Sequence, residues 1–283
     1  MQRYTILHRT FYNFPEQVRL GPHWLRLRPR EGHELRIESS SLEISPPAKL
    51  RWLRDAEDNS VIIATFDQPV RQLMIESNVI IQQYNEAPLD FLVSDYAVEY
   101  PFEYTSGDLI VLAPYLKRSQ SISSGAVKSW IDGVWRAGEK LQSYELLLSL
   151  TRRINQTMRY QLREEPGVQS AEETLALGSG SCRDFATLLL EGARELGFAA
   201  RFVSGYLDTP PSPLDYGATH AWTEIYLPGP GWKGFDPTVG DIVGGDHVSV
   251  AVSHSPSSVP PVEGSYVGPA GAQLEVGVWM TPI

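Results

Sequence analysis

The amino-acid sequence predicts an α+β fold in two parts, a β-rich antiparallel domain over residues 1–125 and an α+β core over residues 126–283. Three observations lead to this prediction. Short apolar runs broken by turn residues fill residues 1–115, apolar spacing becomes helical at about residue 126, and strand-like runs return after residue 198. Strands, then helices, then strands again are typical of α+β proteins, whereas regular alternation indicates a parallel sheet.

The first part is composed of runs rich in Val, Ile, Leu, Tyr and Phe that are separated by Pro, Gly, Asn or Asp. Several of them alternate apolar with polar residues, as in 35–37 and 42–44. Turn signals at this spacing predict a sandwich or a barrel-like antiparallel domain. His8, His23 and His33 fall in different runs, so we expect structural roles for them.

Three helices are predicted in the second part. The segment "GEKLQSYELLLSLTRRINQTM" (138–158) places apolar residues at helical spacing. The segment "SAEETLAL" opens with a capping box, Ser170 followed by Glu173 three residues later. The third helix runs through "CRDFATLLLEGAREL" and is ended by Gly197.

Strands are predicted over "FAARFVSGYL" (198–207) and "THAWTEIYL" (219–227), with a polar, Pro-rich loop between them. A "PGPG" turn then leads into "WKGFDPT" (232–238), which we expect to pair with the preceding strand as a hairpin. The segment "AQLEVGVWM" (272–280) is predicted as a last strand. The sequence leaves open whether the loop 208–218 closes over a cleft.

Composition excludes several classes of function. Net charge is 24 − 34 = −10 with no block of Lys or Arg, so we expect neither a nucleic-acid partner nor a membrane surface. A single Cys forms no internal disulfide, and no apolar run is long enough for a signal sequence or a membrane span, which predicts a cytoplasmic protein. The six His and one Cys lack metal-ligand spacing, so no metal and no cofactor are expected. The oligomeric state is left open.

The only cysteine, Cys182, follows a Gly/Ser turn at the predicted start of the third helix. Ser181 and Asp184 form a second capping box, which makes Ser181 the N-cap and Cys182 the first helical residue. A thiol at a helix N-terminus lies beside unpaired N–H groups that favour thiolate and can bind an oxyanion. Gly178 and Gly180 would leave room for a substrate carbonyl, so Gly180 and Ser181 are candidate substrate-binding residues. The alternative is a small buried hydrophobe, the commoner role of a lone Cys.

A thiol nucleophile needs a base and a group that orients the base. His220 begins one predicted strand, and Asp236 lies 16 residues later near the end of its hairpin partner. We therefore predict Cys182 as nucleophile, His220 as base and Asp236 as the orienting carboxylate. Trp222 is either a wall of the active site, and so a candidate substrate-binding residue, or a core aromatic. His247 is a weaker alternative base.

Three short motifs carry a resemblance to a known family. The segments "CRDFA" (182–186), "HAW" (220–222) and "DPT" (236–238) resemble the signatures of the transglutaminase-like superfamily. The segments "HRTFYNF" and "LRLRPREG" look like the β-rich N-terminal region of its bacterial cysteine protease branch, and "GDHVSVAV" looks like that branch's tail. The resemblance implies a papain-like or transglutaminase-like core, in which the helix with the Cys packs on an antiparallel sheet.

These observations predict a thiol-dependent acyl-transfer enzyme that hydrolyses a peptide or protein amide bond through a thioester. Hydrolysis is favoured because water is always present and nothing in the sequence marks an amine-acceptor site. In addition, true transglutaminases often carry Trp beside the nucleophile, where this chain has Ser181 and Arg183. A transglutaminase, a non-catalytic peptide-binding module and a scaffold with an inert thiol remain as alternatives.

Overall fold

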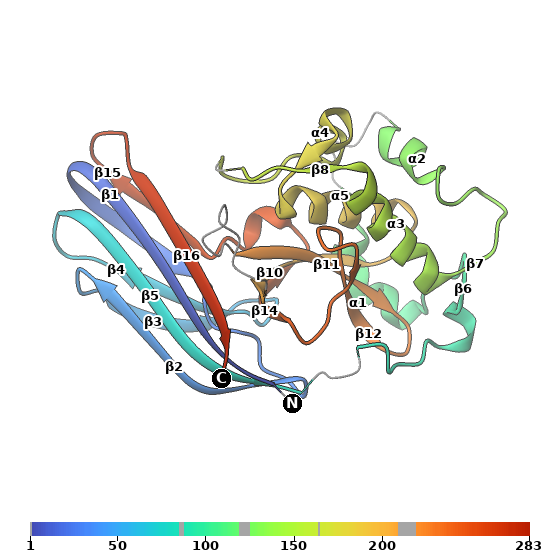
Figure 1. Cartoon of the computed structure of the whole chain (residues 1–283), viewed down its shortest axis with the longest axis horizontal. Helices are drawn as coiled ribbons and strands as arrows, with labels where there is room; N and C mark the ends of the chain where they lie inside the picture. The colour runs from blue at the N-terminus through green and yellow to red at the C-terminus, as the bar shows by residue number, and fades with distance from the viewer. Residues whose placement is uncertain (1, 85–87, 119–124, 164, 209–218) are drawn as a thin grey trace.

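The computed structural model describes residues 2–84, 88–118, 125–163, 165–208 and 219–283. These residues form a large antiparallel sheet on one side and a smaller sheet covered by helices on the other (Figure 1). The predicted α+β class is confirmed.

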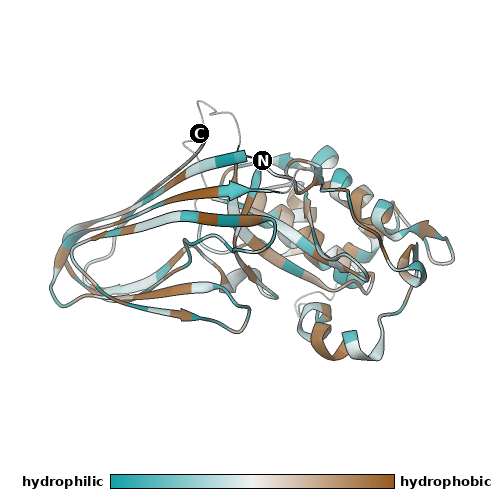
Figure 2. Cartoon of the chain, turned by 90° about the horizontal axis from the view of Figure 1, so that it is seen from below, coloured by the Kyte–Doolittle hydropathy of each residue, from teal (hydrophilic) through white to brown (hydrophobic). Residues whose placement is uncertain are grey.

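The larger sheet contains seven strands, of which five lie in the order β2-β5-β1-β4-β3 and the other two each pair with β1. Its members are β1 (Gln2–Leu25), β2 (Leu35–Ser45), β3 (Lys49–Arg54), β4 (Ser60–Thr65), β5 (Val70–Gln83), β15 (Val262–Val267) and β16 (Gln273–Pro282). Apolar and polar residues alternate along these strands (Figure 2), as expected for a sheet with one packed face.

Strand β1 is long enough to serve two sets of neighbours. Residues 4–13 pair with both β5 and β16, whereas residues 19–25 pair with β15, and the last of them also with β4. The register shifts between Asn13 and Val18, around Pro15, which has no N–H to donate to a neighbouring strand. The irregularity separates the two halves of the strand.

The strand predicted over residues 272–280 is present as part of β16, but it lies in the N-terminal sheet. The sequence-based division assigned it, with the rest of 126–283, to the second part. Alternation of apolar and polar residues identifies a strand but does not say which sheet the strand joins. It therefore could not predict that β16 pairs with β1. The division of the chain after residue 125 itself stays a prediction.

A second difference concerns residues 106–116, which the sequence analysis largely placed in the β-rich run. They form helix α1 (Ser106–Leu116), capped by Thr105, whose side chain accepts a hydrogen bond from the Asp108 N–H. The apolar run "LIVLA" resembles a strand, and its Ile110 and Val111 are largely exposed in the helix. The local β-type composition was therefore misleading here.

The second part is built on a five-stranded antiparallel sheet in the order β13-β12-β11-β10-β14. Its strands are β10 (Ala200–Leu207), β11 (His220–Leu227), β12 (Gly231–Asp236), β13 (Asp241–Ile242) and β14 (His247–Ser253). The predicted hairpin is confirmed by the pairing of β11 with β12, in which Thr223 lies opposite Phe235. The loop 208–218, apart from Asp208, lies outside the described residues.

The remaining elements lie around this sheet. The helices are α2 (Ala126–Ile131), α3 (Ser143–Thr157), α4 (Ala171–Leu177) and α5 (Cys182–Glu195), with short 3₁₀ turns at Asp95–Ala97 and Pro256–Ser258. The short strands are β6 (Glu99–Tyr100), β7 (Leu141–Gln142), β8 (Arg159–Tyr160) and β9 (Ser179–Gly180). The three helices that the sequence predicted correspond to α3, α4 and α5.

The main core lies between the five-stranded sheet and helices α3 and α5. Helix α5 buries a stripe that includes Phe185, Leu188 and Leu189. Thr223 of β11 donates a hydrogen bond from its hydroxyl to the Ala186 carbonyl of α5, at 2.7 Å. The helix that carries the thiol is thus fixed to the strand that carries His220.

The N-terminal sheet packs on β10 and β14 through a separate apolar cluster that includes Tyr4, Ile6, Tyr206 and Val250. Buried polar contacts cross the same boundary. The Asn59 side chain bonds to both the N–H and the carbonyl of Val252, each at 2.8 Å. The five-stranded sheet therefore has protein packed on it from the helices and from the N-terminal sheet. Among the described residues, no helix is long and apolar enough to cross a membrane.

Candidate active site

Helix α5 begins as the sequence predicts, with Ser181 as N-cap and Cys182 as the first helical residue. Asp184 is fully buried and closes the capping box, because its Oδ2 accepts hydrogen bonds from the Ser181 N–H and hydroxyl, both at 2.8 Å. Its Oδ1 accepts from the Gln169 N–H at 2.7 Å and from Arg163 at 2.8 Å. Burial raises the pKa of Asp184, but these hydrogen bonds outweigh burial and hold it below its ordinary value. The first turn of the helix, and with it the direction of the Cys182 side chain, is rigidly fixed.

The two glycines before the helix have structural roles. Gly178 ends α4 in the left-handed region, at φ +60°. A Cβ on Gly180 would lie 2.8 Å from the Cβ of Asp184, so only glycine fits beside the capping carboxylate. The hydroxyl of Ser181 is likewise engaged by Asp184. Substrate binding by Gly180 and Ser181 stays a prediction.

The predicted base and its orienting carboxylate meet across the β11–β12 hairpin. His220 Nε2 lies 2.6 Å from Asp236 Oδ2, and Asp236 is fully buried. The second oxygen of Asp236 accepts from the backbone N–H groups of Thr238 and Val239, at 2.8 and 3.3 Å. Because Nε2 is occupied by the carboxylate, Nδ1 is the ring nitrogen of His220 that remains for Cys182.

The charges at this site depend on one another. Burial lowers the pKa of His220, but the hydrogen bonds and charges of Asp236 and Cys182 outweigh burial and raise it to about 10. Burial likewise raises the pKa of Asp236, yet its hydrogen bonds to His220 and His247 hold it far below its ordinary value. The three predicted residues therefore come together, with the thiol 7% exposed at the edge of the main core.

His247, which the sequence analysis treated as an alternative base, contacts the carboxylate. Its Nε2 lies 3.0 Å from the same Asp236 Oδ2 that binds His220, and its Nδ1 lies 2.7 Å from Asp246 Oδ1. Sequence reasoning missed this arrangement because β14 lies three strands from β12 in the sheet order. The adjacent pair Asp246-His247 was the only signal in the sequence.

Trp222 is only 1% exposed and packs among Val203, Val243 and Val252. Its ring meets that of His247 edge to face at 5.3 Å and lies 6.1 Å from that of His220. A Cβ on Gly205 would lie 2.5 Å from the Trp222 ring, so this glycine makes room for the indole. Trp222 is thus a core aromatic behind both imidazoles, and its role in binding substrate stays a prediction.

One group of His and carboxylate side chains in the described part of the chain is compact enough to hold a metal ion. It consists of His220, Asp236 and His247, whose ligand atoms lie within 4.8 Å of one another. Both imidazole nitrogens are directed at the same carboxylate oxygen in hydrogen bonds. We therefore assign these atoms to the hydrogen-bond network of the site.

Protein-family models match two parts of the chain. Residues 134–237 match the model of the transglutaminase-like superfamily, a span that contains Cys182, His220 and Asp236. These residues form a transglutaminase-like core. Residues 4–82 match the bacterial transglutaminase-like N-terminal region, as the sequence analysis predicted. His247 lies beyond the matched part of the transglutaminase-like core.

Similar proteins include mycobacterial relatives and a solved structure. An uncharacterized protein of Mycobacterium tuberculosis is 28% identical over 302 aligned residues, which cover 99% of this chain and 93% of that protein. An uncharacterized protein of Mycobacterium leprae is 35% identical over 106 residues, 36% of this chain and 37% of that protein. A provisionally assigned cysteine protease from Cytophaga hutchinsonii has the same fold, with a TM-score of 0.76 at 18% identity over 100% of this chain and 91% of that chain.

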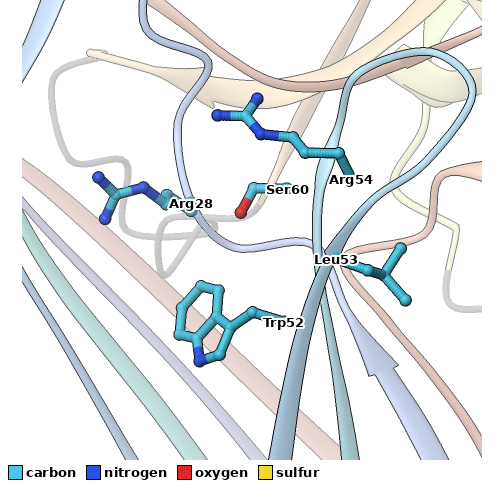
Figure 3. Close-up of a pocket in the computed structure, with 5 residues that line it drawn as sticks. All are labelled: Arg28, Trp52, Leu53, Arg54 and Ser60. Atoms are coloured by element: carbon cyan, nitrogen blue, oxygen red, sulfur yellow. The ribbon is translucent and has the colours of Figure 1, made fainter.

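A surface hollow of about 510 Å³ lies on the N-terminal sheet of this transglutaminase-like protein. It is lined by Arg28, Trp52, Leu53, Arg54 and Ser60, most of which belong to β3 and β4 (Figure 3). These lining residues do not include the thiol, its base or their carboxylate. The hollow is therefore separate from the candidate active site.

Proposed function

We propose that the transglutaminase-like core hydrolyses a peptide or protein amide bond, with Cys182 as nucleophile, His220 as base and Asp236 as the orienting group. The observation that carries the proposal is the 2.6 Å contact between His220 Nε2 and the buried Asp236 Oδ2. It leaves Nδ1 of the ring for the thiol at the start of α5. A nucleophile, a base and an oriented carboxylate in this order are the parts that acyl transfer through a thioester requires.

In the first half of the reaction, His220 Nδ1 accepts the thiol proton and Cys182 Sγ attacks the amide carbonyl. The resulting oxyanion lies where the N–H groups of the first turn of α5 have no acceptor within the helix, and the Cys182 N–H is the first of these. The imidazolium then donates its proton to the departing nitrogen. The C–N bond breaks and the thioester remains.

In the second half, water attacks the thioester while His220 accepts one of its protons. The C–S bond breaks, the carboxylic acid leaves, and the proton returns to the thiol. Asp236 stays ionised throughout, because its pKa lies far below neutrality, and it keeps the proton of His220 on Nε2. Trp222 excludes water from behind the two imidazoles, which strengthens the electrostatic interactions of the pair.

The test is the turnover of the full chain on a peptide library, followed by mass spectrometry, with and without a primary amine as competing acceptor. We expect peptides cleaved by water, with a trapped acyl group on Cys182. Cys182→Ala should abolish turnover and leave thermal unfolding unchanged. Amide products formed with the added amine, in place of free acid, would identify a transglutaminase instead.

A second measurement distinguishes the enzyme from a peptide-binding module. The alkylation rate of Cys182 by iodoacetamide is measured from about pH 4 to 10, an interval that includes the ordinary range of a free thiol at about 8.5. A poised thiolate–imidazolium pair gives fast alkylation at low pH that is lost in His220→Ala. Slow alkylation that rises only near the ordinary range, in wild type and variant alike, would exclude the proposed enzyme. The cytoplasmic location also stays a prediction.

A further inference from the structure

We infer that His247, held in its doubly protonated form by Asp246, is a positioning residue that fixes the Asp236 carboxylate. His247 and His220 then share the negative charge of that carboxylate. The inference rests on the proposed function, because it assigns a role in the same triad. His247 acts through Asp236, whose carboxylate it contacts.

Both ring nitrogens of His247 face carboxylate oxygens. Nε2 lies 3.0 Å from Asp236 Oδ2, and Nδ1 lies 2.7 Å from Asp246 Oδ1. A neutral imidazole has one N–H, so one of these contacts would set a lone pair against a carboxylate. The Gly244 N–H also approaches Nδ1, but at 3.4 Å this contact is long. The two short contacts to carboxylates therefore require an imidazolium.

The surroundings of His247 support this protonation state. The side chain is 1% exposed, and burial lowers its pKa, but the hydrogen bonds to Asp236 and Asp246 outweigh burial and raise it above the ordinary value. Asp246 is half exposed, and its own pKa is lowered, first by its hydrogen bond to His247. The titratable groups that surround the ring and its two carboxylates are His220, Asp236, Asp246, Asp208 and Tyr4.

The position of His247 determines what it does to the triad. Asp236 Oδ2 accepts from His220 and His247 at once, while Oδ1 is held by two backbone N–H groups. With all four partners present, the carboxylate cannot rotate away from His220. The positive charge of His247 also offsets part of the negative charge of the Asp236 carboxylate. The carboxylate then holds the proton of His220 less strongly, so His220 releases a proton to the leaving group more readily.

The backbone of His247 is fixed by the N-terminal sheet. Gln83, at the end of β5, donates a hydrogen bond from Nε2 to the His247 carbonyl at 3.1 Å, in a buried position. On the neighbouring strand, a Cβ on Gly205 would lie 2.3 Å from the Val248 carbonyl oxygen, so the absence of a side chain lets β14 approach closely. The network thus extends from the thiol to the first part of the chain.

The test combines nitrogen-resolved NMR of the histidine rings with kinetics on the full chain. In wild type at about neutral pH we expect both His247 nitrogens to be protonated, with a midpoint above the ordinary value near 6.5. Asp246→Asn should lower that midpoint by about one pH unit or more. In a Cys182→Ala background, His247→Gln should raise the His220 midpoint by about one pH unit, because a neighbouring positive charge is lost.

The kinetic readout separates positioning from general damage. His247→Phe keeps bulk but removes the hydrogen bond, and we expect kcat to fall on the order of 100-fold with KM changed less than about twofold. His247→Gln, which keeps an N–H for Asp236, should recover most of this loss. His254→Gln is the matched control, since His254 pairs with Glu57 on an exposed surface away from the triad.

A singly protonated His247 at neutral pH, or an unchanged His220 midpoint in His247→Gln, would overturn the inference. If His247→Phe fails to fold, the NMR midpoints of His247→Gln and Asp246→Asn test the inference instead. The NMR titrations need no turnover. Shifted midpoints without cleavage of any peptide would therefore count against the proposed function alone, and cleavage with unshifted midpoints would count against the role of His247 alone.

Discussion

Replacing Asp236 by Asn preserves the shape of the side chain and reverses the hydrogen bonding at the triad. In wild type, Oδ2 accepts from Nε2 of His220 at 2.6 Å and of His247 at 3.0 Å. An amide NH₂ in that place donates, so both rings must present a bare Nε2 and carry their proton on Nδ1. His220 would then direct an N–H at Cys182 and could not accept the thiol proton. We expect turnover to fall about 10⁴-fold, as the wrong tautomer does in other triads.

The same substitution has a consequence for stability that can be worked from the structure. Burial lowers the pKa of His220, but Asp236 and Cys182 raise it to about 10, against an ordinary value of 6.5. At about 1.36 kcal/mol per pKa unit, this difference corresponds to about 5 kcal/mol in favour of the protonated ring. Because the folded-state pKa is raised, this stabilisation is fully present below pH 6.5 and is lost as the pH rises through about 10.

The assay is urea unfolding at about pH 6 and about pH 10, which bracket the window set by His220. As the pH rises from about 6 to about 10, the free energy of unfolding of the wild type should fall by several kcal/mol more than that of Asp236→Asn. In the variant, no carboxylate at position 236 stabilises the charged ring of His220. Asp241→Asn is the control, because Asp241 lies on the surface and approaches Arg152 only at 3.9 Å. Equal pH dependence in wild type and Asp236→Asn would refute the reasoning.

Two further substitutions test the supports of the thiol helix. Gly180→Ala would place a Cβ 2.8 Å from that of Asp184, so we expect the free energy of unfolding, measured by heat or urea, to fall by about 1–3 kcal/mol. Gly32→Ala is the control, because a Cβ there has open space and should change the free energy of unfolding little. Arg194→Ala removes a buried guanidinium that donates a hydrogen bond to the Ala200 carbonyl of β10, at 2.8 Å, and forms an ion pair with Glu191 of α5. We expect the free energy of unfolding to fall by about 3–5 kcal/mol. An unfolding midpoint equal to that of wild type would show that neither contact supports the helix.

The helix start and the His220–Asp236 contact, which the sequence predicts and the structure contains, have local signals. The spacing of Ser181 and Asp184 identifies a helix start, and the start of a helix fixes the direction of its first side chain. A turn of few residues between two strands brings His220 and Asp236 together, since hairpin partners are close in sequence. Both arrangements depend on residues fewer than twenty positions apart, so the sequence alone was sufficient.

The parts that were missed depend on the order of strands in a sheet. His247 reaches Asp236 because β14 pairs with the far edge of β10, and β16 lies beside β1 because the chain returns across the molecule. Alternating apolar residues identify each of these strands but do not name its neighbour. The helix at 106–116 was missed for another reason, because its exposed Ile110 and Val111 gave it the composition of a strand.

The pairing of β1 with β16 also determines the order in which the protein can be completed during synthesis. Residues 4–13 are synthesised long before one of their two neighbours, residues 273–282. Until then β1 presents an open edge of unpaired N–H and carbonyl groups, which is a template for association with other chains. Contacts between such distant parts of a sequence form slowly, so this edge of β1 stays open at least until residues 273–282 have been synthesised.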